Sequence, residues 1–291
     1  MDLETYYGPL RAWVAEKEDE LFTRPIADFG SVVAKRSNTD GPFVGWLKSM
    51  PTLEAAAYMA AAKGTLSALA GTALWRDNLT FAALALHLSA YVSASVFDRV
   101  DQRLARKMKG KLPAVDFSHG LNLCVALKLS EEATWMASSA ARFVSSGLLN
   151  MAKQEYATYS IMYARKWLGL PELPWPEGLD RQEWYETPLN EWPDVSTLAI
   201  KKLVEHHELG KEQPEPFEPG WEWALMPFDV LPVEILALRQ MLPSVKGRID
   251  QVRHPMLGPW MSLELAADTG STTRKIKEIA REFQSFVSSQ E

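Results

Sequence analysis

Hydrophobic residues recur every three or four positions along most of the chain, which is the spacing of one face of an α-helix. Between positions 55 and 73 the spacing links Tyr58, Ala62, Leu66, Leu69 and Ala73. In the last segment it links Ile276, Ile279, Phe283 and Phe286, and charged residues fill the other positions. The alternation of polar and apolar residues that is typical of strands is not sustained anywhere. The pattern predicts an all-α fold.

Two segments, 55–73 and 82–95, are rich in alanine, glycine and serine on almost every face. A helix with such small side chains approaches its neighbours closely all round, so we expect both segments at the centre of the molecule. Short links, such as Arg76-Asp77-Asn78, predict antiparallel helix hairpins. The expected architecture is therefore a helical-repeat-like array of hairpins, although the chain carries no fixed-period solenoid motif.

Polar residues ahead of the apolar runs predict where helices begin, because their side chains cap the first turn. The predicted N-caps are Thr52, Asn78, Asp116 and Ser130. Gly169 after a helical run is a predicted stop, because glycine readily adopts the left-handed conformation that ends a helix. Pro232 predicts the first turn of a later helix.

The composition changes after Leu170. Positions 171–223 hold eight prolines, five tryptophans and thirteen acidic residues against four basic ones. A helix is expected from about 194 to 208, with Gly210 as its stop. This density of tryptophan predicts ordered loops held on the helical body by aromatic side chains. We expect one helical domain over 1–291; the alternative is a subdivision into a helical body, 1–170, and an acidic loop region with C-terminal helices, 171–291.

The charge balance bears on possible partners. The chain has 291 residues, of which 47% are hydrophobic, and its net charge is −6. An acidic protein is a poor match for nucleic acid, which binds basic surfaces. The basic run at 99–111 contains Asp101 and lacks aromatic residues for stacking bases, so it predicts an exposed helix end and loop. The expected partner is a basic protein.

Two runs, 55–75 and 79–97, are long enough to cross a membrane. Both are alanine- and serine-rich, and Lys63 and His87 lie near their centres, so they predict buried helices of a soluble protein. The first ten residues lack the basic-then-apolar pattern of a signal peptide. Cys124 is the single cysteine and has apolar neighbours, which predicts a buried, inert thiol. These features are typical of a cytoplasmic protein.

The histidines do not form a metal-binding motif. His206 and His207 are adjacent, so on a helix they point about 100° apart and cannot clamp one ion as residues four apart do. They are interpreted as part of a solvated helix C-terminus. His87 and His119 are expected to be core or capping groups, and His254 is expected to fix a turn. We predict no metal and no cofactor.

Acidic and aromatic residues alternate between 215 and 229. Aromatic side chains are frequent energetic anchors of protein interfaces, and surrounding carboxylates attract a cationic partner. An alternative is that these tryptophans only hold loops onto the core. The predicted partner-binding residues are Glu215, Phe217, Glu218, Trp221, Glu222, Trp223 and Asp229.

The chain resembles the all-helical bacterial immunity proteins that neutralise polymorphic or type VI secretion toxins. The resemblance covers the layout of most of the chain: small-residue hairpins, an acidic segment, and then the stretches FDVLPVEILALRQM and RHPML. It implies a cytoplasmic, monomeric or dimeric protein that occludes the active site of a cognate toxin. Nuclease toxins are commonly basic, which suits the acidic segment.

Two other functions remain open from the sequence. The first is a helical, metal-dependent hydrolase in which several histidines converge on one pocket, drawn from His87, His119, His206, His207 and His254. The second is a scaffold or adaptor that binds a peptide in a groove between helices. A continuous acidic face rimmed by aromatic residues is expected instead for the toxin inhibitor.

Overall fold

The computed structural model describes residues 3–152, 154–179, 181–210 and 226–290. The described part of the chain is predominantly helical and contains no β-strand, which confirms the all-α prediction. In the N-terminal half the helical elements are α1 (Leu3–Glu18), a π-helical turn (Asp19–Thr23), α2 (Arg24–Ala27), α3 (Phe29–Asp40), α4 (Pro42–Leu69), α5 (Leu74–Phe97), α6 (Gln102–Lys107), α7 (Ala114–Ala126) and α8 (Ser130–Ser146). In the C-terminal half they are α9 (Glu155–Trp167), α10 (Glu183–Asn190), α11 (Thr197–Gly210), α12 (Val233–Met241), a 3-10 turn (Pro243–Val245), α13 (Lys246–Ile249), α14 (Gly258–Met261) and α15 (Ser271–Ser288).

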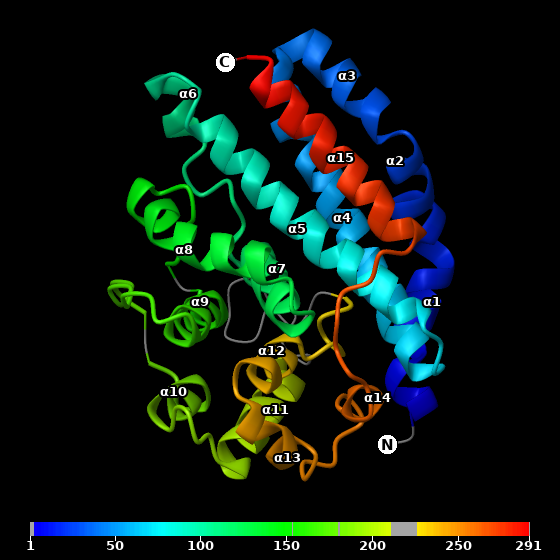
Figure 1. Ribbon diagram of the computed structural model, residues 1–291, viewed down its shortest axis with the longest axis vertical. Coiled ribbons are helices and arrows are strands. Elements are labelled where there is room, and N and C mark those ends of the chain that lie inside the picture. The colour runs from blue at the N-terminus through cyan, green and yellow to red at the C-terminus, as the bar shows by residue number, and fades with distance from the viewer. Residues whose placement is uncertain (1–2, 153, 180, 211–225, 291) are drawn as a thin grey trace.

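The central unit is the hairpin of α4 and α5, the two small-residue segments. Figure 1 shows them side by side, with α15 along α5 and with α7, α9 and α12 below them in that view. Their small residues bring the backbones together: a Cβ atom at Gly64 would lie 2.8 Å from the Leu79 side chain. The predicted central position of both helices is confirmed, because their alanines are almost all buried.

Helix α5 is also the one described helix that is long and apolar enough to cross a membrane. In the protein, 89% of the most apolar stretch of α5 is buried. Its apolar surface is therefore satisfied by packing within the chain.

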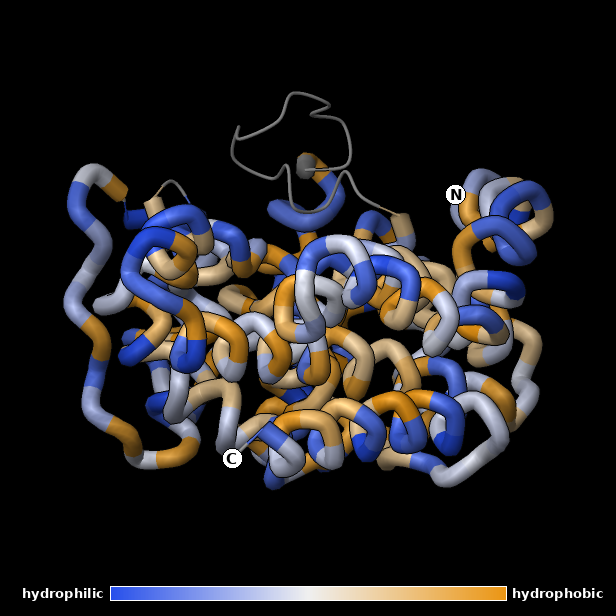
Figure 2. Tube along the Cα trace, turned by 90° about the horizontal axis from the view of Figure 1, so that it is seen from above, coloured by the Kyte–Doolittle hydropathy of each residue, from blue (hydrophilic) through white to orange (hydrophobic). Residues whose placement is uncertain are grey.

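The final helix, α15, covers α5 with one apolar stripe. Ile276, Ile279 and Phe283 are buried and Phe286 packs partly buried against the core, as the sequence predicts. Apolar residues recur every three or four positions along this helix, which ends near the label C in Figure 2. The stripe therefore docks on the body of the protein.

Several predicted helix starts are wrong. Thr52 lies inside α4, which runs unbroken through Pro51. Asn78 lies inside α5, where its amide donates to the Leu74 carbonyl at 3.0 Å, and Asp116 lies in the first turn of α7. Ser130 is the first residue of α8 and not its cap. At Thr52 and Asn78 the helix continues through the predicted cap, so the local capping preference is overridden there.

The predicted link at 76–78 is also wrong, and Asp77 has a different role. The α4–α5 connection lies at 70–73. The Asp77 carboxylate accepts hydrogen bonds from the backbone of Thr272 and Thr273 at 2.9 and 2.8 Å, at the start of α15. A Cβ atom at Gly270 would lie 2.3 Å from the Asp77 side chain, so this close approach requires glycine. Asp77 thus caps a helix almost 200 residues away in the sequence.

Candidate functional site: a pocket lined by two carboxylates

A pocket of about 550 Å³ opens between α4, the start of α7 and the chain that precedes α9. Two carboxylates, Glu54 and Asp116, line it together with Tyr58. We call this site the carboxylate pocket. Its remaining lining residues are Ala55, Gly110, Leu112, Pro113, Ala114, Val115, Asn150 and Gln154. Among the described residues that line it, none is basic.

Helical geometry brings the polar groups together. Glu54 and Tyr58 are four residues apart on α4, so they share a face. The Tyr58 hydroxyl donates a hydrogen bond to Asp116 Oδ1 across to α7. The hydroxyl of Ser89, on α5, donates to Glu54 Oε1. Each carboxylate therefore receives a hydrogen bond from a neutral hydroxyl.

The two carboxylates share a poorly solvated space. Burial raises the pKa of Glu54, and the negative charge of Asp116 raises it further, against the opposing hydrogen bond from Ser89. Burial also raises the pKa of Asp116, and the hydrogen bond from Tyr58 only partly offsets this. Two like charges in a low-dielectric pocket repel, so the pair holds a proton more tightly than exposed carboxylates do. A cation in the pocket would relieve this repulsion.

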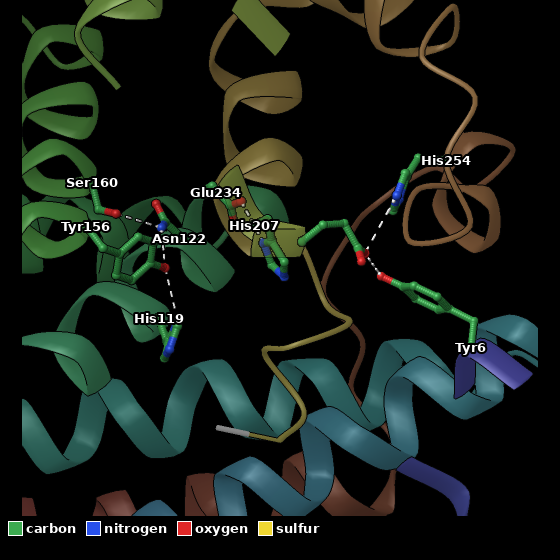
Figure 3. Close-up of polar contacts among 9 residues, drawn as sticks. Tyr6, His119, Asn122, Tyr156, Ser160, His207, Glu234 and His254 are labelled. Carbon is green, nitrogen blue, oxygen red and sulfur yellow. Dashed lines mark hydrogen bonds and ion pairs between the residues drawn. The ribbon is translucent and has the colours of Figure 1, made fainter. Parts of the chain in front are cut away.

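A buried polar cluster, drawn in Figure 3, lies next to the pocket, where the rings of His119 and Tyr58 have centroids 6.3 Å apart. His119 Nδ1 lies 2.9 Å from the Tyr156 hydroxyl, and the Asn122 amide donates to Tyr156 at 2.9 Å and to Ser160 at 3.0 Å. The Tyr156 hydroxyl accepts the Asn122 hydrogen bond, and a hydroxyl that accepts in this way can also donate to a ring nitrogen such as His119 Nδ1. These bonds fix α7 against α9 and hold the wall that carries Asp116.

The end of the acidic segment is anchored beside the pocket. Phe228 is fully buried, stacks on the His119 ring with centroids 3.6 Å apart, and meets the Tyr58 ring edge-to-face at 5.1 Å. Tyr58 therefore contacts both Asp116 and Phe228. The chain returns from the acidic segment next to the two carboxylates.

Most of the predicted partner-binding residues lie outside the described residues, namely Glu215, Phe217, Glu218, Trp221, Glu222 and Trp223. Asp229 is described and is half-buried. Burial raises the pKa of the Tyr7 hydroxyl, and the negative charge of Asp229 raises it further, which places Asp229 near the N-terminal helix. Part of its side chain faces inward.

The interpretation of His206 and His207 as part of a solvated helix end is wrong. His206 is 7% exposed and His207 is fully buried. His206 stacks on Trp184 with ring centroids 4.4 Å apart, and burial lowers its pKa to about 4. His207 Nδ1 lies 3.1 Å from Glu234 Oε1 on α12. His206 and His207 are enclosed by tertiary contacts that the local sequence does not show.

The neighbouring Glu208 faces a third direction. It accepts a hydrogen bond from the Tyr6 hydroxyl and lies 3.6 Å from His254 Nε2. His254 also accepts a hydrogen bond from the Met256 backbone at 3.3 Å, so the prediction that it fixes a turn is confirmed. Figure 3 shows the His207–Glu234 pair and the Tyr6–His254 contacts as separate groups.

The histidines thus do not meet in one pocket. His87 and His119 lie on α5 and α7, in different environments from each other and from the α11 pair. Within the described ranges, no group of three or more His, Cys, Asp or Glu side chains is placed to hold a metal ion. Cys124 is buried, as predicted, and burial raises its thiol pKa.

Sequence reasoning missed the carboxylate pair. Asp116 was assigned only a capping role, and Glu54 carried no prediction. The available signal was Glu54 itself, a lone carboxylate beside the small-residue segment that the sequence predicts to be central. A charge in a helix that is buried on most faces needs a partner or a pocket.

Comparisons with known proteins do not assign the chain to a family. No protein-family model matches the chain, and no curated protein or solved structure is significantly similar to it.

Proposed function

We propose that this chain is a cytoplasmic, immunity-type binding protein that neutralises a basic bacterial toxin, and that the carboxylate pocket receives a lysine or arginine side chain of the toxin. The observation that carries the proposal is the pairing of Glu54 and Asp116 in a pocket whose described lining has no basic residue. A cationic side chain between them would turn a repulsive pair into two attractive contacts.

The pocket is suited to such an anchor. Its volume of about 550 Å³ is ample for one long side chain, and its apolar walls would cover the methylene stem. Leu112 and Ala114 are buried and form part of these walls. A charged contact that is shielded from water contributes more to binding than one at an exposed rim.

The acidic segment supports the same partner. Positions 171–223 carry thirteen acidic and four basic residues. The segment rejoins the described chain at Met226, and Phe228 packs on Tyr58 of the pocket. A basic surface would be attracted by both acidic features, which speeds association and fixes orientation.

Paired carboxylates with raised pKa values also suit general acid–base catalysis, so a helical hydrolase is a second candidate. The two functions respond differently to Glu54→Gln. An acid–base residue is needed for every turnover, whereas a binding pocket that keeps Asp116 retains part of its affinity.

The test is to produce the toxic domain encoded by the neighbouring open reading frame, with and without this protein. Wild-type protein is expected to restore growth and to co-purify with the domain. The double variant Glu54→Gln/Asp116→Asn is expected to lose protection, because it removes both charges while keeping the side-chain volumes. Circular dichroism would check that the variant is folded.

A matched control is Glu131→Gln/Glu132→Gln, which removes two carboxylates at the start of α8, away from the pocket. It is expected to protect as well as wild type. Equal loss in the control would show that only net charge matters, and full protection by the pocket variant would exclude the pocket as the contact. Absence of toxicity and of a complex would overturn the immunity function.

A further inference from the structure

A second pocket, of about 560 Å³, lies between α5, α8 and α15 and takes no part in the proposed toxin contact. His87 and Tyr91 from α5 and Trp135 from α8 line one side of it. We call it the histidine pocket. Its volume falls within the range of small-molecule sites, which is roughly 300–1,000 Å³.

The three rings form one aromatic group. The His87 ring meets Trp135 edge-on with centroids 5.0 Å apart, and it lies nearly parallel to Tyr91 at 6.3 Å. Tyr91 and Trp135 also meet edge-on, at 5.5 Å. Aromatic rings favour such edge-to-face and offset arrangements, so a further flat ring would find partners here.

His87, Tyr91 and Trp135 make no side-chain hydrogen bond to any residue in the described ranges. Burial lowers the pKa of His87 to about 4, so the imidazole is neutral at physiological pH. A neutral imidazole offers one hydrogen-bond donor and one acceptor.

The rim of the pocket carries charges of both signs. Glu131 and Glu132 lie on the α8 side, and Lys277 and Arg281 lie on the α15 side. Two acidic and two basic residues give no net preference for a charged occupant. The inner wall includes apolar residues, among them Leu84 and Ile276.

We propose that the histidine pocket binds a small, neutral heteroaromatic molecule, which packs against Trp135 and Tyr91 and forms a hydrogen bond with His87. The flat ring matches the aromatic wall, its neutrality matches the balanced rim, and a ring N–H or ring nitrogen matches the unused imidazole. The carboxylate pocket lacks this combination, because its described lining has no histidine or tryptophan and includes two carboxylates.

The experiment uses indole and indene as probes of the purified full-length chain. The two molecules have nearly the same shape, but only indole has a ring N–H. Imidazole signals of the five histidines are followed by ¹H–¹⁵N NMR during each titration. Indole is expected to shift the His87 signals selectively and to bind about tenfold more tightly than indene, which corresponds to one net hydrogen bond.

Variants separate the hydrogen bond from the packing. His87→Phe keeps a flat ring but removes the nitrogens, so indole affinity should fall about tenfold, to the level of indene, while indene binding persists. Because His87 signals are then lost, binding is followed by saturation transfer to the probe. Trp135→Ala should weaken both probes, and Trp167→Ala, outside the pocket, should weaken neither. Unshifted His87 signals, equal binding of indole and indene, or full indole affinity in His87→Phe would each overturn the proposal.

Discussion

The carboxylate pocket and the histidine pocket have nearly the same volume, yet their chemistry differs. Ser89 of α5 donates to Glu54 in the first pocket, and His87 lines the second. The two residues are two positions apart, so they point about 200° apart around the helix. One helix thus supplies a polar group to pockets on opposite sides.

Burial acts on both pockets by favouring the neutral form, but with opposite effects on bound protons. Glu54 and Asp116 have raised pKa values, so the folded state binds protons that the unfolded state has released. His87 has a lowered pKa, so the folded state has released a proton that the unfolded state keeps. Linkage then makes the carboxylate contribution to stability fall with rising pH, and the histidine contribution rise.

Charge reversal in the acidic segment should have the largest effect. Changing Glu218, Glu222 and Asp229 to lysine is expected to weaken toxin binding by at least about 100-fold, roughly 2.7 kcal/mol, because like charges would then meet. Binding is measured by calorimetry on the purified complex. Since Asp229 is half-buried, the Glu218→Lys/Glu222→Lys double variant serves as the folding control. Unchanged affinity would exclude the acidic segment as the contact face, and unchanged indole binding would show that the histidine pocket is separate.

The next largest effect is expected where α5 packs on α7, because these helices carry residues of both pockets. A Cβ atom at Gly120 of α7 would lie 2.8 Å from Leu86 Cβ of α5, so Gly120→Ala is expected to lower the free energy of unfolding by about 1–3 kcal/mol. Gly30 in α3 has no atom within 4 Å of such a Cβ, so Gly30→Ala should raise it by about 0.5–1 kcal/mol. Urea denaturation measures both. Equal changes in the two variants would contradict the close α5–α7 approach.

A smaller effect should identify the carboxylate pair by its pH dependence. Glu54→Gln removes a buried carboxyl group, which destabilises the fold only when it is ionised. The variant is therefore expected to stabilise the protein by about 1–2 kcal/mol near pH 8 and by almost nothing near pH 5. Urea unfolding at several pH values tests this. A gain that is the same at every pH would mean that Glu54 titrates as an exposed carboxylate.

The smallest effect is expected at His87, whose contribution to stability should change with pH in the opposite direction to that of Glu54. Wild-type protein is expected to lose stability as the pH falls from 6.5, the ordinary pKa of histidine, toward the value of about 4 that His87 has in the fold. His87→Leu lacks this titration and should gain about 1 kcal/mol relative to wild type near pH 5.5. The same denaturation series measures it. A constant difference between pH 5 and pH 8 would show that His87 is not kept neutral.

Features that depend on neighbours along one helix could be predicted from the sequence. The apolar stripe of α15 and the burial of Cys124 follow from residues within one or two turns. The caps at Thr52 and Asn78 failed, because a polar residue ahead of an apolar run also fits inside a longer helix. The cap that Asp77 provides could not be predicted either. Its carboxylate caps α15, which is distant in the sequence, so no local pattern identifies this partner.

The sequence by itself determined that this protein is all-α, that α4 and α5 are central, and that acidic residues concentrate after position 170. These properties follow from periodicity and composition, which are carried by the chain wherever it folds. Only the tertiary structure decided that Glu54 meets Asp116, that His207 meets Glu234, and that His87 joins Trp135. Each of these pairs joins different helices, and their positions depend on how whole helices pack, which is set by many small contacts at once.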